Sequence, residues 1–174
     1  MYHFKLINMG KAIVIYNSRT GNTKKVAMKI AEGLGADCAS LGKIPKLDEY
    51  KLIIVGSWVM MGRISFGGAR LLRRLKMKGL KGKKIAMFFT SGKPDEIHPF
   101  TKDSENPKTI FDIMFTTMEN KLGGKDITIL EERFYASGET RMFKNSEPME
   151  PIGHPDEKEL AQALAFGEQL KKLC

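Results

Sequence analysis

The sequence predicts an α/β fold in which helices cover both faces of a parallel sheet. Apolar runs typical of strands alternate along the chain with segments of helical spacing. This alternation specifies parallel strands joined by right-handed crossovers. The three strongest runs, at 11–16, 50–57 and 83–91, are continuously apolar rather than alternating. Strands that are buried on both faces have this pattern.

The remaining elements complete this layered fold. A run at 126–135 predicts a fourth strand, and a shorter, weaker run at 36–41 suits an edge strand. Helical spacing predicts four helices, at 22–34, 65–77, 108–121 and 156–173. In the first of them, Val26, Ile30 and Leu34 fall on one face and lysines on the other, which is the pattern of a helix packed against a core.

Length and composition indicate one folded domain over residues 1–174, with residues 1–10 as a possible extension. No apolar run approaches the roughly 20 residues of a membrane span, and the N-terminus lacks the order of a signal peptide, so we expect a cytoplasmic protein without a transmembrane segment. Cys38 and Cys174 are the only cysteines and the three histidines are scattered. We therefore expect no metal site.

The formal net charge of +9 raises the question of an anionic partner. Basic residues are densest near the end of the second predicted helix, at Arg70, Arg73, Arg74, Lys76, Lys78, Lys81, Lys83 and Lys84. Cations at a helix C-terminus are favoured by the macrodipole, so the simplest interpretation is a solvated helix end. An acidic protein partner is the second interpretation. Nucleic acid is not expected, because no aromatic residues interleave the cations.

The segment "SRTGNT", residues 18–23, lies where ligands bind in open α/β sheets, directly after the first strand. Backbone N–H groups at the start of a helix and the hydroxyls of Ser18, Thr20 and Thr23 suit a phosphate. Gly21 permits a close backbone approach. The alternative is a simple turn with a helix cap from Ser18 or Asn22.

The sequence lacks the binding motifs for other phosphate-containing ligands. A dinucleotide site needs G-x-G-x-x-G, and a nucleoside triphosphate site needs a lysine before the Ser or Thr of its loop. Neither pattern is present, and the first strand ends in Tyr16 and Asn17 rather than in aspartates. The residues therefore favour a ligand with a phosphate group that is not part of a magnesium-bound polyphosphate.

The sequence resembles the flavodoxin family, because "SRTGNT" matches its [ST]-x-T-G-x-T phosphate loop at every defined position. Three more segments resemble the family in the right order: "YKLIIVGSWVMMGRIS", "IAMFFTSG" and "GHPDEKELAQALAFGEQL". The resemblance implies a flavodoxin-like, doubly wound sheet of five parallel strands in the order 2-1-3-4-5, with FMN at the carboxyl ends of the strands.

The resemblance also implies the cofactor-binding residues. Ser18, Thr20 and Thr23, with the backbone of Arg19, Gly21 and Asn22, hold the phosphate. The isoalloxazine ring lies between two loops, formed by Ser57, Trp58, Val59, Met60, Met61 and Gly62 and by Thr90, Ser91, Gly92 and Lys93. Trp58 is expected to stack on the ring or to contact its edge. An ordinary buried tryptophan, and methionines that fill the core, are the alternatives for Trp58, Met60 and Met61.

Some positions indicate redox properties. Met61 and Gly62 match a Met-Gly pair that some family members place beside flavin N5. The resemblance implies that the Gly62 carbonyl can turn toward the N5 hydrogen on reduction. Positive charges at Arg63, Arg19 and Lys93 are expected to stabilise the anionic reduced flavin and raise its potential. His98 is interpreted as a polar surface residue, with a proton donor near the flavin as the alternative.

We therefore expect an FMN-binding electron-transfer protein that passes electrons between redox protein partners, and we assign no catalytic residue. The alternative is an FMN-dependent oxidoreductase acting on a quinone or a protoporphyrinogen-type substrate, because "GSWVMMGRIS" resembles a loop of menaquinone-dependent protoporphyrinogen oxidases. The long segment 136–154, with Tyr135, Arg141 and Phe143, would then serve as a substrate lid or partner surface. A flavin-free interaction module is the third hypothesis.

Overall fold

The computed structural model describes residues 11–124, 126–141 and 146–173. Its sheet has five parallel strands in the order β2-β1-β3-β5-β6, which confirms the predicted topology. The strands are β1 (Lys11–Tyr16), β2 (Asp37–Ser40), β3 (Tyr50–Met60), β5 (Lys84–Ser91) and β6 (Thr128–Ser137). The possible extension over residues 1–10 lies outside the described residues.

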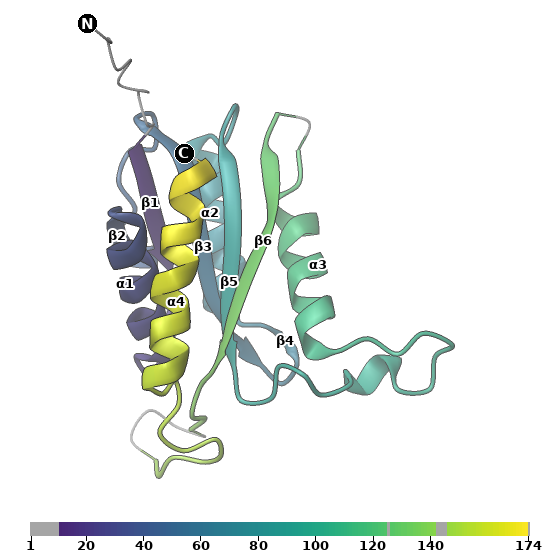
Figure 1. Ribbon diagram of the computed structural model, residues 1–174. Coiled ribbons are helices and arrows are strands. Elements are labelled where there is room, and N and C mark those ends of the chain that lie inside the picture. The colour runs from purple at the N-terminus through teal and green to yellow at the C-terminus, as the bar shows by residue number, and fades with distance from the viewer. Residues whose placement is uncertain (1–10, 125, 142–145, 174) are drawn as a thin grey trace, which may run out of the picture.

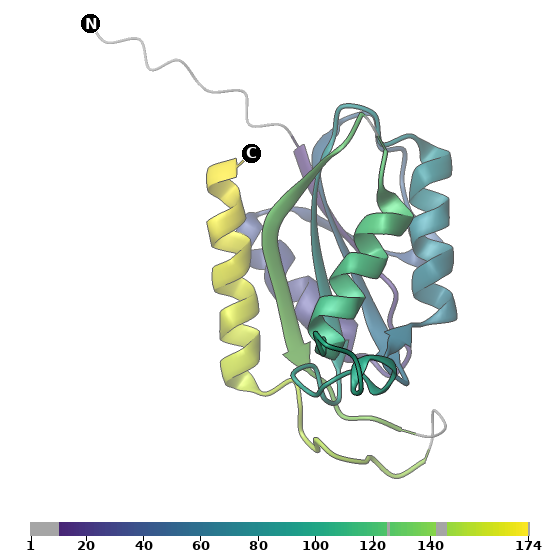
Figure 2. The same ribbon diagram turned by 90° about the vertical axis from the view of Figure 1, so that its right-hand side faces the viewer.

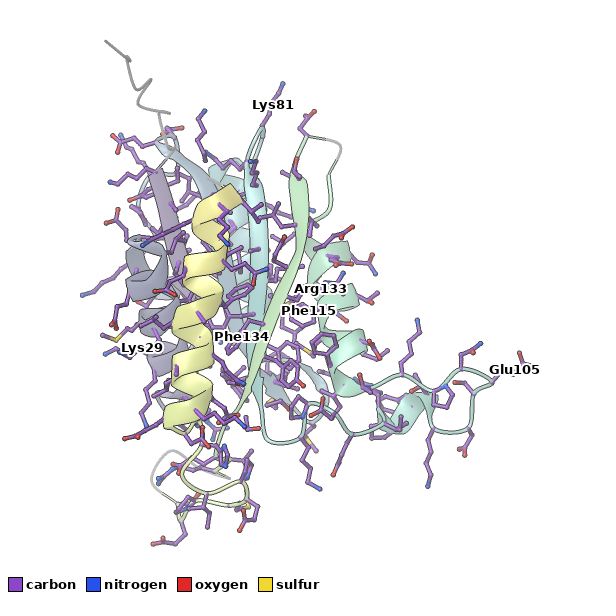
Figure 3. The ribbon with its side chains drawn as sticks, viewed as in Figure 1. Lys29, Lys81, Glu105, Phe115, Arg133 and Phe134 are labelled. Carbon is purple, nitrogen blue, oxygen red and sulfur yellow. The ribbon has the colours of Figure 1, made fainter. Side chains whose placement is uncertain are left out.

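Helices cover both faces of this sheet, as predicted (Figure 1). The helices are α1 (Asn22–Leu34), α2 (Phe66–Lys78), α3 (Ile110–Leu122) and α4 (Glu157–Leu170). Helices α1 and α4 pack on one face and α2 and α3 on the other, and each pair encloses an apolar core. In Figure 3 the rings of Phe115 and Phe134 mark the two cores: Phe115 packs 4.9 Å from Phe89, and Phe134 stacks 5.5 Å from Phe166, between ring centroids. Short 3₁₀ turns occupy Leu41–Lys43, Pro99–Thr101 and Lys171–Leu173.

Two glycines set the distance between α1 and α4. A Cβ atom on Gly33 would lie 2.0 Å from the Leu164 carbonyl oxygen, and one on Gly167 would lie 2.2 Å from that of Ile30. Contacts this short are impossible for real side chains. The two helix backbones therefore touch directly.

Strand β3 is longer than the sequence predicted. It continues through Met60 and turns back into a short antiparallel strand, β4 (Arg63–Ile64), which the sequence analysis missed. The two turn residues, Met61 and Gly62, have φ of 50° and 74°. Positive φ at both positions is the pattern of a type I′ hairpin turn, which usually carries Asn-Gly, Asp-Gly or Gly-Gly there. The hairpin was not predicted from the sequence because Met-Gly is not one of these usual turn pairs.

Lys83 does not belong to the solvated basic tract in which the sequence placed it. Its side chain is buried, and Nζ donates hydrogen bonds to the carbonyls of Leu47 and Tyr50 at 2.6 and 2.8 Å. Burial lowers the pKa of Lys83. This lysine ties the loop before β3 to the start of β5. Among the described residues, no helix is long and apolar enough to cross a membrane.

Candidate functional site

Two adjoining hollows lie at the carboxyl ends of the central strands. The first, here called the narrow cavity, has a volume of about 70 Å³. The second, here called the apolar cleft, has a volume of about 830 Å³, within the range of small-molecule sites. Ser91, Gly92 and Thr140 line both. A phosphate-sized group fits the first and a fused ring fits only the second.

Residues from four segments line the narrow cavity: Arg19, Thr20, Asn22, Thr23, Trp58, Thr90, Ser91, Gly92, Gly138, Glu139, Thr140 and Arg141. Helix α1 begins here. Gly21 takes its N-cap position with φ of 104°, and no described side chain caps the helix. The side chains of Ser65, Thr109 and Asp156 cap α2, α3 and α4. The open N–H groups of α1 therefore favour an anion in this cavity.

Asn22 and Ser18 do not act as the helix caps that the alternative interpretation required. The Asn22 side-chain amide donates to the Glu139 carbonyl at 2.9 Å, and the Ser18 hydroxyl accepts from the Gly21 N–H at 3.2 Å. The buried Thr23 hydroxyl shares a hydrogen bond of 2.8 Å with that of Thr90. This last contact joins the start of α1 to the end of β5.

Segment 138–141, which directly follows β6, forms the outer wall of the narrow cavity. The sequence analysis assigned no cofactor contact to it. Arg141 pairs with Glu139 at 2.8 Å, and this guanidinium holds the pKa of the Glu139 carboxyl below its usual value. The two charges balance each other, so Glu139 adds no net negative charge to the cavity wall. Phe143, named with Arg141 from the sequence, lies outside the described residues.

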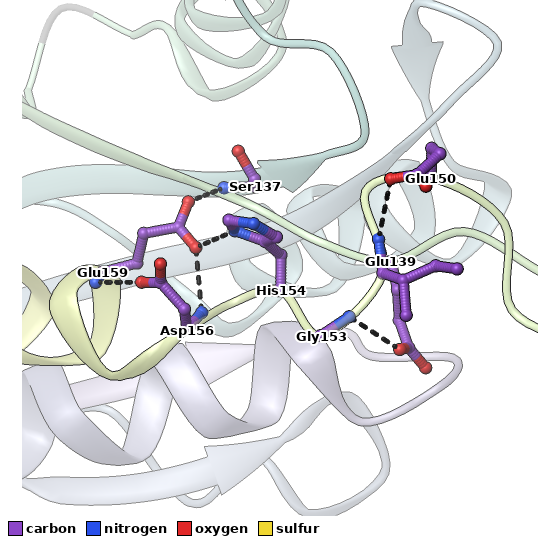
Figure 4. A network of polar contacts seen from close by, with 8 residues as sticks. Ser137, Glu139, Glu150, Gly153, His154, Asp156 and Glu159 are labelled. Carbon is purple, nitrogen blue, oxygen red and sulfur yellow. Dashed lines mark hydrogen bonds and ion pairs between the residues drawn. The ribbon is translucent and has the colours of Figure 1, made fainter.

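A polar network at the start of α4 anchors this wall (Figure 4). Glu159 accepts from the Ser137 N–H at 2.6 Å and from the Asp156 N–H at 2.9 Å, and its Oε2 lies 2.6 Å from His154 Nδ1. The His154 carbonyl in turn accepts from the Glu139 N–H at 2.9 Å. The cap of α4 is therefore connected through His154 to the cavity wall.

His154 gives this anchor a pH dependence. Hydrogen bonding to Glu159 raises the pKa of His154 above the model-peptide value of 6.5. Its stabilising contribution is fully present below the unfolded-state pKa and is lost as pH rises through the folded-state pKa. We expect His154→Gln to lower stability by about 1 kcal/mol at pH 6. The loss should fade at alkaline pH, in thermal unfolding curves recorded from pH 6 to 9. An equal loss at every pH would contradict a charged pair.

The apolar cleft lies between the β3–β4 hairpin and the loop that follows β5. Val59, Met60, Met61 and Gly62 line it from the hairpin, and Gly92, Lys93, Pro99 and Phe100 line it from the loop. The Arg63 guanidinium lies 4.7 Å from the Phe100 ring centroid. Lys93 pairs with Glu96 at 2.6 Å, so its charge is partly balanced.

His98 is buried, which corrects its interpretation as a surface residue. Its Nδ1 accepts from the Phe100 N–H at 3.3 Å, and its Nε2 lies 3.0 Å from the Gly62 carbonyl oxygen. Because Nδ1 accepts a hydrogen bond, Nε2 carries the ring proton and donates a hydrogen bond to the Gly62 carbonyl oxygen. His98 therefore fixes the hairpin turn to the loop after β5. No sequence signal pairs residues so far apart.

The structure places the other expected cofactor residues in four different locations. Thr20, Asn22, Thr23, Trp58 and Thr90 face the narrow cavity, whereas Val59 to Gly62 and Lys93 face the cleft. Ser18 faces a different hollow beside α2. The Ser57 side chain lines neither site, because it is buried and lies 3.3 Å from the Ser65 hydroxyl. Arg19 also lines the narrow cavity, and its guanidinium lies 5.6 Å from the Trp58 ring centroid.

Met61 occupies a costly position for its residue type. It is 92% exposed and has positive φ, which is strained for a side chain with a Cβ. We expect Met61→Asn to stabilise the protein by roughly 0.5–1 kcal/mol, because asparagine tolerates this conformation. Chemical denaturation measures the change. A loss of stability would mean that the Met61 side chain packs in the folded state.

Fold and site together define an α/β protein whose parallel sheet carries an anion cavity and an apolar cleft at its topological switch point. The Flavodoxin domain family matches residues 13–168. The chain therefore belongs to the flavodoxin family, which confirms the resemblance seen in the sequence.

Individual relatives agree with this assignment. An uncharacterised protein of Methanocaldococcus jannaschii is 25% identical over 93% of this chain and 99% of its own length. The flavodoxin-like domain-containing protein BilS of Clostridium symbiosum is 28% identical over 47% of this chain, and the match spans half of BilS.

Solved structures share the fold. A flavodoxin from the domain Archaea superimposes with a TM-score of 0.60 at 21% identity, over 94% of this chain and 97% of its own. Oxidised flavodoxin 2 of Bacillus cereus gives a TM-score of 0.61 at 18% identity, over 94% and 99%.

Proposed function

We propose that this protein binds FMN and transfers electrons between redox partner proteins. Flavodoxins typically bind this flavin. The observation that carries the proposal is the pairing of a phosphate-sized anion cavity with an adjoining apolar cleft. The donor set of uncapped N–H groups, threonine hydroxyls and a guanidinium suits a phosphate monoester, and the cleft suits a flat ring.

The residues of the chain bind and position the flavin, which itself supplies the redox chemistry. Thr20, Thr23 and the first N–H groups of α1 would hold the phosphate, with Trp58 at the cavity wall. Met60, Met61 and Gly62, which line the cleft from the hairpin, would hold the ring. Arg63 also lines the cleft and would favour negative charge on the ring, which would raise its reduction potential.

A reductive titration of the purified, FMN-loaded protein tests the proposal. FMN is expected to bind tightly, and stepwise reduction under anaerobic conditions should give two separate one-electron midpoint potentials. A colourless protein that takes up no FMN would reject flavin binding altogether. A single two-electron potential would leave FMN binding intact but reject one-electron transfer as the function.

The cleft supports a second candidate, an FMN-dependent oxidoreductase acting on a quinone or a protoporphyrinogen-type substrate. Its lining is mainly apolar, and its volume of about 830 Å³ lies within the range of small-molecule sites. Turnover of a soluble quinone by a reduced pyridine nucleotide, together with a single two-electron potential, would favour this enzyme over the carrier.

A further inference from the structure

The exposed face of α2 carries a groove that is strongly basic. The groove is lined by Phe66, Ala69, Arg70, Leu72, Arg73, Lys76 and Lys121. Four of these seven residues are cations and none is acidic. No ion pair links Arg70, Arg73 or Lys76 to any other residue that the structure describes. A solvated helix end would explain cations in the last turn, but Arg70 lies in the first half of α2.

The groove adjoins the apolar cleft. Phe66 lines both, and it is 84% exposed at the start of α2. Met61 and Phe100, also on the cleft, are 92% and 73% exposed. Figure 2 shows α2 and α3 side by side on this face, with β4 at the base of α2. Exposed large apolar side chains beside a charged rim are typical of protein-binding surfaces.

Three acidic groups near this surface are engaged by partners within the protein. Glu96 pairs with Lys93, Glu119 pairs with Arg133, and Asp112 forms the capping box of α3. The groove on α2 itself holds four cations and no acidic residue, so its potential is positive and attracts a negatively charged partner.

We propose that an acidic redox protein docks on the surface formed by Met61, Phe66 and Phe100 together with Arg70, Arg73 and Lys76. This inference rests on the proposed function, because it names the partner for electron transfer at the same cleft. The apolar side chains bring the partner's redox centre to the cleft, and the cations of α2 steer and orient it. With FMN bound at the cleft, one electron would pass from the partner's reduced centre to the flavin, any proton gained at the flavin would come from solvent, and no covalent bond would form between the two proteins.

The test uses a small acidic two-iron ferredoxin as the probe and the FMN-loaded protein. The double variant Arg70→Glu with Arg73→Glu is compared with a control of equal net charge, Lys158→Glu with Lys172→Glu, whose lysines are exposed on and just after α4 at the opposite face. Stopped-flow absorbance measures the second-order rate of electron transfer at several salt concentrations. We expect the wild-type rate to fall as salt rises, and the α2 variant to be slower at low salt by at least about tenfold. The control should change less than about threefold.

Other outcomes would overturn the proposal. Equal losses in the two double variants would show a net-charge effect without a docking surface. A faster reaction with basic cytochrome c than with the ferredoxin would exclude an acidic partner. Binding of polyuridylate that disappears in the α2 variant, with an unchanged ferredoxin rate, would assign the groove to nucleic acid.

A failure of flavin binding is separable from a failure of docking. If the protein takes up no FMN, fluorescence anisotropy of labelled ferredoxin still measures docking on the same variants. Anisotropy that rises with wild-type protein and the control but not with the α2 variant would support the docking surface by itself.

Discussion

Replacing Thr20 by aspartate is expected to weaken FMN binding by about 100-fold without unfolding the protein. Thr20 is exposed and lines the narrow cavity, so the change removes no core contact. A carboxylate there repels the FMN phosphate, and about 2.7 kcal/mol of such repulsion corresponds to 100-fold in affinity. The same carboxylate stabilises the start of α1 by a few tenths of a kcal/mol, because it meets the positive end of the helix dipole.

Two measurements separate these effects. Fluorescence quenching of FMN gives the affinity, and thermal unfolding of the apoprotein gives the stability. Thr20→Ser keeps the hydroxyl and serves as the control, with affinity expected within about threefold of wild type. If Thr20→Asp bound FMN as tightly as wild type, the phosphate would have to lie outside the narrow cavity.

Replacing Gly167 by alanine is expected to destabilise the protein by about 3 kcal/mol, which lowers Tm by roughly 6–12 °C. In most helices a glycine-to-alanine change stabilises, by up to about 1 kcal/mol. The sign is reversed here because the new Cβ would lie 2.2 Å from the Ile30 carbonyl oxygen and 2.8 Å from the Leu34 N atom. Both are backbone atoms, so α1 and α4 must move apart.

Calorimetry of the apoprotein checks this result. Gly42→Ala is the control, because a Cβ at Gly42 meets no atom within 4 Å, and its stability should stay within about 0.5 kcal/mol of wild type. An unchanged Tm for Gly167→Ala would mean that α1 and α4 are not in backbone contact.

Local patterns were sufficient for most of the secondary structure. Continuous apolar runs located β1, β3 and β5, and the periodic spacing of Val26, Ile30 and Leu34 located α1. These patterns are reliable because a buried strand or an amphipathic helix must repeat its apolar residues at a fixed period. The loop at residues 18–23 was located just as directly at the start of α1, since its residues are consecutive.

Contacts between residues that lie far apart in the sequence could not be predicted from it. Asn22 bonds to Glu139, which lies 117 positions away, and His98 bonds to Gly62 across 36 positions. Lys83 was assigned to the surface because its two carbonyl acceptors belong to another segment. In each case the chemistry of one residue depends on a partner that only folding brings near.

The sequence by itself determined the layered fold, the topology of its sheet and the loop that begins α1. The tertiary structure decided how the ends of the strands are completed: a hairpin at Met61 and Gly62, a wall at 138–141 and a basic groove beside the cleft. The physical reason is the range of the interactions. The apolar periodicity that marks each helix and strand is set by neighbouring residues, whereas cavity walls and surface charge follow from segments that meet at the edge of the sheet.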